Sequence, residues 1–122
     1  VMGIGYRPDF ADAGLSPGLA IAKSLRGDFG LEVAVADPMW SDNELENLTG
    51  FRSVGALDFS DFAAVALITP HSAWADQPAF TVGWHAGQFV FDAQGAWAKH
   101  ELFFRALDVE YTQVGRAGWL RK

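Results

Sequence analysis

Polar side chains that could bind or transform a ligand gather where the apolar runs of this 122-residue chain end. Arg7 and Asp9 follow the first run, His71 follows a later one, and Asp92 closes another. If these runs are parallel strands, their carboxyl ends share one edge, which is where ligands bind in open α/β sheets. The residues that collect there are Arg7, Asp9, Asp37, Thr69, His71, Asp92 and Gln94. The sequence therefore predicts one shared binding edge.

Alternating strands and helices are needed to bring these residues together. We expect strands at residues 1–6, 31–36, 51–54, 63–68, 88–91 and 109–114, and helices from 17 to 27 or 30, 41–48, 72–76 and 96–107. The almost continuous apolar run 63–68 is typical of a strand covered on both faces. This order predicts an α/β fold for a single domain, residues 1–122: a three-layer, Rossmann-like arrangement with a mostly parallel sheet and helices on both faces. Trp97, Leu102 and Phe103 are the expected inward residues of the last helix.

Two helices carry clear start signals. Ser16 followed by Pro17 is typical of an N-cap residue and a first helical residue. Ser41 and Glu44 have the spacing of a capping box. These signals fix where the loops before the helices must end.

Composition excludes several classes of function. The net charge of −6 and the pI of about 4.8 argue against a nucleic-acid partner. The absence of cysteine excludes disulfides, thiolate zinc sites and a cysteine nucleophile within the chain, and it suits a reducing, cytoplasmic location. No apolar run is long enough to span a membrane, and we expect no signal peptide. Because the sequence begins inside a strand-like run, we expect a fragment of a longer protein.

The glycines of Gly3-Ile4-Gly5 do not predict a dinucleotide site. The fingerprint needs a third glycine where this chain has Pro8, and a long loop separates the strand from the helix at Ser16. The alternative is that Gly3 and Gly5 allow a helix to pack closely against the sheet.

Arg7 has two interpretations. Its guanidinium could make paired contacts with a phosphate, helped by helix amides near Ser16. It could equally form a surface salt bridge with Asp9 or Asp12. The residue types alone do not decide between them.

His71 could act as an acid, a base or a ligand, or as a hydrogen-bonded structural histidine, which the absence of a nearby partner in sequence favours. His85 and His100 have no metal-site spacing with it, so we expect no metal site.

The segment Asp92-Ala93-Gln94-Gly95 could line the same crevice or form a plain turn, and Asp37-Pro38 is typical of a turn. The tryptophans are interpreted as core or interface residues, since no basic residues alternate with them. They are Trp40, Trp74, Trp84, Trp97 and Trp119.

Several of these segments together resemble one known family. The run Gly5-Tyr6-Arg7-Pro8-Asp9 with Ser16-Pro17 resembles the opening of the C-terminal, UDP-binding domain of UDP-glucose/GDP-mannose dehydrogenases. Further segments are similar to that domain in the same order: Val35-Ala36-Asp37-Pro38, Thr69-Pro70-His71 with Trp74, Val90 to Gly95 with Trp97, and Tyr111 to Arg116.

The resemblance implies a domain that holds the nucleotide diphosphate part of a nucleotide sugar, through Arg7, Asp9, Ser16, His71, Asp92, Gln94 and Gly95. It places the NAD-binding domain, the catalytic cysteine and much of the dimer interface in preceding parts of such enzymes. We therefore expect no catalytic residue and no cofactor in this chain, NAD in the complete enzyme, and a homodimer as a candidate assembly.

The departures from the family pattern define the alternative. Arg7 replaces a lysine, while Gly14 and Gln94 stand where the family has arginines. A charged hydrogen bond contributes about 1.5–3 kcal/mol, so losing two would weaken diphosphate binding strongly. Lys23, Arg26 and Arg116 are the remaining candidate cations. The alternative function is a degenerate domain that acts as a structural or protein-interaction module.

Overall fold

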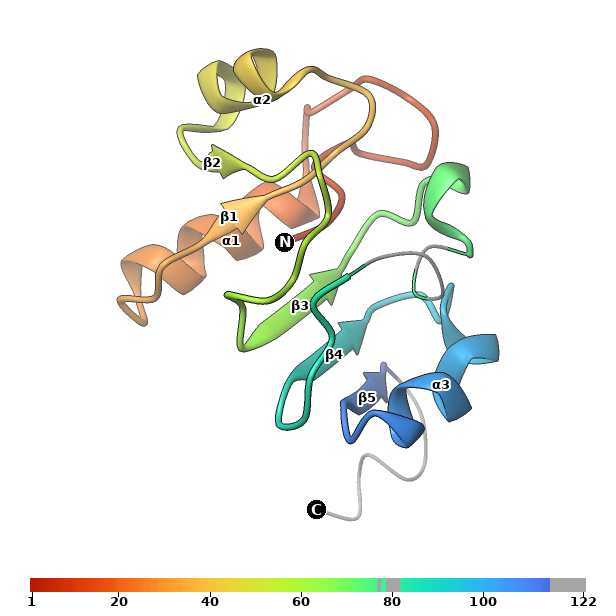
Figure 1. Ribbon diagram of the computed structural model, residues 1–122. Coiled ribbons are helices and arrows are strands. Elements are labelled where there is room, and N and C mark those ends of the chain that lie inside the picture. The colour runs from red at the N-terminus through yellow and green to blue at the C-terminus, as the bar shows by residue number, and fades with distance from the viewer. Residues whose placement is uncertain (77, 79–81, 115–122) are drawn as a thin grey trace.

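The computed structural model describes residues 1–76, 78 and 82–114 of the chain, and Figure 1 shows how they are arranged. The elements are α1 (Pro17–Gly27), β1 (Ala34–Val35), α2 (Asp42–Thr49), β2 (Arg52–Ser53), β3 (Ala64–Leu67), η1 (Ser72–Trp74), β4 (Phe89–Asp92), η3 (Ala98–His100), α3 (Glu101–Ala106) and β5 (Glu110–Gln113). Strands and helices alternate along these residues, as the sequence predicts.

The strands lie in the order of a dinucleotide-binding sheet. β1 pairs with β2, and β3, β4 and β5 form a second group; every pairing is parallel. Met2 joins the two groups, because it forms parallel bridges to both Ala36 and Leu67. The spatial order is thus β2, β1, the Met2 segment, β3, β4, β5. Counted along the chain this is 3-2-1-4-5-6, the order of doubly wound sheets.

Two hydrophobic cores lie on opposite faces of this sheet. One cluster packs Ala22 of α1 and Leu45 of α2 against Val35. The other packs Phe104 of α3 against strand residues that include Ala36. Because Val35 and Ala36 are consecutive in an extended segment, their side chains point to opposite faces. The predicted α/β domain with a parallel sheet and helices on both faces is therefore confirmed.

The predicted helix starts are confirmed as well. The Ser16 side chain accepts a hydrogen bond from the Leu19 amide with Pro17 as the first helical residue, and α1 ends at Gly27. Ser41 and Glu44 form both hydrogen bonds of the capping box at the start of α2. Among the described residues, no helix combines the length and apolar character needed to cross a membrane.

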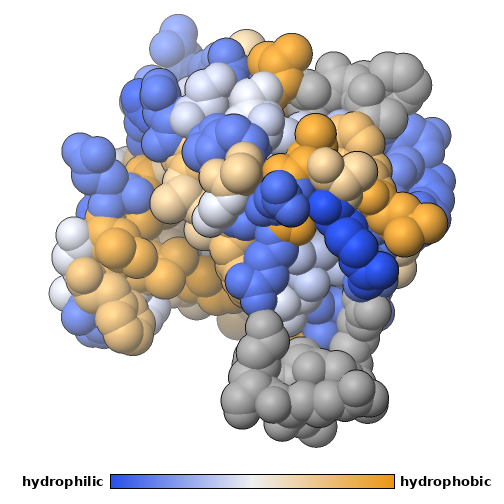
Figure 2. All heavy atoms as spheres, turned by 60° about the horizontal axis from the view of Figure 1, so that its bottom comes forward, coloured by the Kyte–Doolittle hydropathy of each residue, from blue (hydrophilic) through white to orange (hydrophobic). Residues whose placement is uncertain are grey.

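The last helical segment differs from its prediction. It is divided into η3 and α3, and Leu102, predicted to face the core, is 74% exposed. Trp97 is fully buried and Phe103 is half-buried against the core, as predicted, and Phe104 is the buried residue that the sequence pattern missed. The expectation that β3 is covered on both faces is also wrong in part, because Ala64 is exposed. Figure 2 shows hydrophobic side chains reaching the surface in separate areas of one face.

Gly18 lets α1 lie directly against the central strand. The packing interpretation assigned this role to Gly3 and Gly5, but a Cβ on those residues would meet the backbone of Thr69 and of Phe10 and not a helix. A Cβ added to Gly18 would stand 2.0 Å from the carbonyl oxygen of Gly3. Gly3 itself has a φ of 97° and lies against the backbone of Thr69, where a Cβ would be 2.5 Å from the Thr69 nitrogen. Backbone atoms cannot give way as a flexible side chain can, so only glycine fits at both positions.

We predict that Gly18→Ala lowers the free energy of unfolding by about 2–3 kcal/mol, because overpacking forces α1 away from the sheet. Urea denaturation monitored by tryptophan fluorescence measures this. Gly27→Ala is the matched control: it also lies in α1, but a Cβ there meets nothing within 4 Å. The control should be neutral or slightly stabilised, by up to about 1 kcal/mol. Equal effects for the two variants would contradict the packing argument.

Candidate functional site

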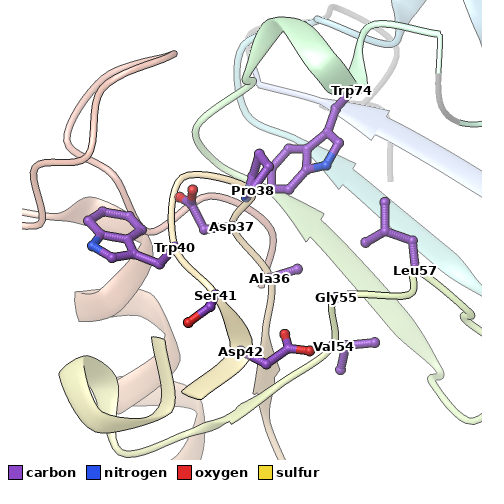
Figure 3. A pocket seen from close by; sticks show the side chains of 10 residues that line it. All are labelled: Ala36, Asp37, Pro38, Trp40, Ser41, Asp42, Val54, Gly55, Leu57 and Trp74. Atoms are coloured by element: carbon purple, nitrogen blue, oxygen red, sulfur yellow. The ribbon is translucent and has the colours of Figure 1, made fainter. Parts of the chain in front are cut away.

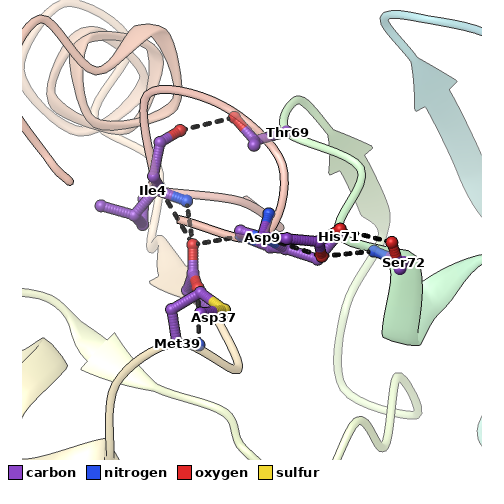
Figure 4. A network of polar contacts seen from close by, with 8 residues as sticks. Ile4, Asp9, Asp37, Met39, Thr69, His71 and Ser72 are labelled. Carbon is purple, nitrogen blue, oxygen red and sulfur yellow. Dashed lines mark hydrogen bonds and ion pairs between the residues drawn. The ribbon is translucent and has the colours of Figure 1, made fainter. Parts of the chain in front are cut away.

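The candidate site lies where the strand order reverses, between the Met2 segment and β3. Two loops leave the sheet there, residues 5–16 and residues 68–71, and the loop that follows β1 approaches them (Figure 1). Figure 4 shows that Asp9, Asp37, Thr69 and His71 come together at this point, although they are far apart in sequence. The shared edge predicted from the sequence therefore exists for these four residues.

Asp37 is the buried centre of the network. Its Oδ2 accepts hydrogen bonds from the amides of Ile4 and Gly5, at 2.8 and 2.9 Å, and from His71 Nε2 at 2.8 Å. Its Oδ1 accepts from the Met39 amide at 2.9 Å. Burial acts to raise the pKa of this carboxyl, but these hydrogen bonds outweigh it, and the pKa lies below its ordinary value. Asp37 is therefore an ionised carboxylate held by internal donors.

The two hydrogen-bond partners of His71 determine the tautomer of its neutral ring. The Asp9 amide donates to Nδ1 at 2.8 Å, so this nitrogen must carry a lone pair. The proton therefore sits on Nε2 and is donated to Asp37. The side chain is 1% exposed and its ring meets Trp74 edge-on. This environment agrees with the structural interpretation of His71, because a ligand outside the fold cannot reach the ring.

Asp9 and Ser72 fasten the first loop to the segment after β3. The Asp9 carboxylate accepts hydrogen bonds from both the amide and the hydroxyl of Ser72, and these bonds lower the pKa of Asp9. Thr69 Oγ1 donates to the carbonyl of Gly5 at 2.7 Å. Asp9 adopts a φ of 64°, a left-handed conformation that aspartate tolerates better than most residues. The loop is thus attached through side chains at two points.

Arg7 stands on the exposed side of this loop. Its guanidinium lies over the ring of Phe10, 3.9 Å from the ring centroid. The salt bridge to Asp9 or Asp12 that the sequence allowed is absent from the described residues. A cation–π contact orients the guanidinium and leaves its hydrogen-bond donors available, so Arg7 can meet an anion.

The other predicted cations are placed differently. Arg26 lies over Phe51 and donates to the carbonyl of Gly50, beside α2. Lys23 is exposed on α1. Arg116 and Trp119 lie outside the described residues.

Asp92, Gln94 and Gly95 follow β4. The Asp92 carboxylate is fully buried and accepts four hydrogen bonds, from the amides of Gly95, Ala96 and Trp97 and from the hydroxyl of Tyr111. These bonds agree with the turn interpretation of the segment. Gln94 is exposed and donates to the carbonyl of Ile68, just after β3. Contact with a ligand stays a prediction for Gln94 and Gly95, whereas Asp92 has its oxygens fully occupied.

The Ser16 side chain is also occupied, because it caps α1 and the residue is buried.

Two residues of the candidate site were not predicted from the sequence: Ser72, which binds Asp9, and Phe10, which supports Arg7. Their positions after His71 and Arg7 are the only signals that could have identified them. Within the part of the chain that the structure describes, no group of three or more histidine or carboxylate side chains could hold a metal ion.

A cleft of about 360 Å³ lies on the other side of Asp37, between the β1–α2 loop and the segment after β2. Figure 3 shows the indole of Trp40 at one end and that of Trp74 at the other. The lining residues are Ala36, Asp37, Pro38, Trp40, Ser41, Asp42, Val54, Gly55, Leu57 and Trp74. The lining holds two carboxylates and no cation, so the cleft does not suit a diphosphate.

We predict that Asp37→Asn lowers the free energy of unfolding by about 3 kcal/mol at neutral pH, because a hydrogen-bonded charge is lost from a buried site. Because folding lowers the pKa of Asp37, the stabilisation that its charge provides is fully present above about pH 4, the pKa of an unfolded carboxyl. This stabilisation is lost as the pH falls through the lower pKa of Asp37 in the folded protein. The difference between wild type and variant should therefore narrow in acid.

Denaturant unfolding at several pH values checks this prediction. Asp61→Asn is the control, because Asp61 is exposed and forms no hydrogen bond or ion pair with the described residues. A difference between wild type and Asp37→Asn that stays constant from neutral pH to strong acid would be inconsistent with an ionised Asp37.

The comparisons with known proteins agree with this geometry. The model of the UDP-glucose/GDP-mannose dehydrogenase family, UDP binding domain, matches residues 1–99. Searches among curated proteins and among solved structures found no significant match. The matched range holds the whole network around Asp37 and the loop that carries Arg7. The chain therefore belongs to the UDP-glucose/GDP-mannose dehydrogenase family and contains its UDP-binding domain.

Proposed function

We propose that this chain binds the diphosphate of a nucleotide sugar through Arg7, as one domain of an NAD-dependent dehydrogenase. The observation that carries the proposal is the placement of Arg7 at the switch point of the sheet, stacked on Phe10 and free of any carboxylate among the described residues. A guanidinium held in this way offers a planar pair of donors to phosphate oxygens. The family match supports the same ligand class.

NAD binding and catalysis are assigned in this proposal to parts of the enzyme outside residues 1–122. In dinucleotide-binding sheets, an acidic residue about 20 residues beyond the glycine-rich turn receives the ribose hydroxyl. Asp37 is the acid that follows β1, the second strand of the sheet along the chain, but it accepts hydrogen bonds from Ile4, Gly5, Met39 and His71. Its occupied oxygens support a nucleotide site that is not a dinucleotide site.

The described tryptophans do not favour the alternative of a protein-interaction module, because Trp74 and Trp97 are buried and Trp40 and Trp84 are half-buried. A homodimer stays a prediction, which sedimentation velocity can test, and so does a cytoplasmic location.

We predict saturable binding of UDP-glucose by isothermal titration calorimetry, and an affinity at least about tenfold lower for Arg7→Ala, since one charge-assisted contact is lost. Arg7→Lys should keep part of the affinity, because lysine retains the charge without the planar pair of donors. Arg105→Ala is the matched control: it removes the same charge from α3, where Arg105 pairs with Glu101. No heat for UDP-glucose, UDP or GDP-mannose would overturn the proposal, as would equal weakening by both alanine variants.

A further inference from the structure

One buried imidazole connects the three segments that build the candidate site. His71 follows β3, donates from Nε2 to Asp37 after β1, and accepts at Nδ1 from the amide of Asp9 in the first loop. Figure 4 shows His71 meeting both Asp9 and Asp37. Removing either contact would leave a buried polar group without its partner, which is costly in a dry environment.

The first loop is a closed unit that depends on this contact. The Tyr6 amide donates to the carbonyl of Asp12, which closes residues 6–12 into one turn of chain with Asp9 inside it. Asp9 is therefore the residue through which the turn is attached to the sheet edge, by its amide to His71 and by its carboxylate to Ser72. Arg7 lies two residues before Asp9 in the same closed turn, so its position follows that of Asp9.

We propose that neutral His71 is the positioning residue of the nucleotide-binding loop, and that protonation of its ring releases Asp9 and moves Arg7 out of its binding position. This proposal rests on the function proposed above and adds its regulation. His71 does not touch the ligand in this scheme; it acts through the loop.

Protonation has a defined structural consequence here. A proton on Nδ1 would point at the N–H of Asp9, so two donors would face each other where one hydrogen bond now exists. The charged groups that face the ring among the described residues are the carboxylates of Asp37 and Asp9. Asp9 Oδ1 lies 3.9 Å from Nδ1, which is too far for a hydrogen bond, so the loop must shift before this oxygen can accept a hydrogen bond from the charged ring. The loop therefore has two alternative sets of contacts.

Histidine side chains in general change their charge between mildly acidic and neutral pH, so the test is made across that range. UDP-glucose is the suitable probe, because its diphosphate is esterified at both ends and has no phosphate proton to lose in that range. Any pH dependence of its affinity then belongs to the protein.

The test measures the wild-type chain at about pH 8 and about pH 5.5, on either side of the usual histidine titration. NMR of the ¹⁵N-labelled chain follows the ring nitrogens of His71 and the amide of Asp9, and calorimetry follows UDP-glucose. We expect the Asp9 amide signal to shift together with His71 protonation, and the affinity to fall about tenfold, the equivalent of one hydrogen bond.

Two substitutions separate the contacts of the ring. In His71→Asn the side-chain oxygen can take the place of Nδ1 and accept from Asp9, but it does not titrate, so binding should persist and lose its pH dependence. In His71→Gln the side-chain nitrogen can keep the bond to Asp37 but the Nδ1 acceptor is lost, so affinity should be low at both pH values. His85→Asn is the control, because His85 contacts Ala86 and Ser60 away from the loop, and it should keep the wild-type pH profile.

The possible failures are distinguishable. Absence of UDP-glucose binding at about pH 8 overturns the proposed function, while the NMR titration still tests the loop. Affinity that is unchanged while His71 becomes protonated overturns the positioning role, as does an Asp9 amide that does not respond. Circular dichroism of both His71 variants guards against loss of fold, and the wild-type titration needs no substitution at all.

Discussion

The buried Asp37 carboxylate is the group on which the architecture of this edge depends. A charge in a dry interior is tolerated only where donors surround it. Here the donors come from the Met2 segment, through the amides of Ile4 and Gly5, and from His71 after β3. The carboxyl ends of three adjacent strands are thereby tied together. The loops that follow these strands must therefore leave the sheet at fixed points. The closed turn that carries Arg7 belongs to one of these loops, so its position is fixed as well.

The same interaction explains how one strand order can serve two kinds of ligand. The 3-2-1-4-5-6 order places an acid after the second strand of the sheet, where a dinucleotide fold offers it to a ribose. In this chain that acid is Asp37, which points into the protein and accepts hydrogen bonds from the protein's own amides. Pro8 and the long first loop then replace the tight glycine turn. On the proposed function, ligand recognition moves from the strand ends to the loop that carries Arg7.

Local signals in the sequence were sufficient for much of the fold. The caps at Ser16 and at Ser41 depend on residues three positions apart, and the alternation of strands and helices predicted the parallel sheet and the edge at which Asp9, Asp37, Thr69 and His71 meet. The predictions that failed concerned contacts between residues far apart in sequence, or depended on the exact phase of a helix. Asp37 and His71 are 34 residues apart, and nothing near either residue identifies its partner. Leu102 was misassigned because the predicted helix is divided into η3 and α3, which changes the helical phase.

An acidic domain that binds a diphosphate must keep its own carboxylates from repelling the ligand. The residues at this edge meet that requirement in a common way: Asp9, Asp37 and Asp92 each accept hydrogen bonds from backbone amides, and Asp37 and Asp92 are buried as well. Amide dipoles directed at a carboxylate reduce the field that it projects outward. Arg7 needs no such partner, because stacking on Phe10 leaves its charge exposed. Most of the polar residues that the sequence grouped as one site are therefore internal supports, and Arg7 is the outward cation. On the proposed function, this arrangement offers an anion a locally favourable place on a chain of net charge −6.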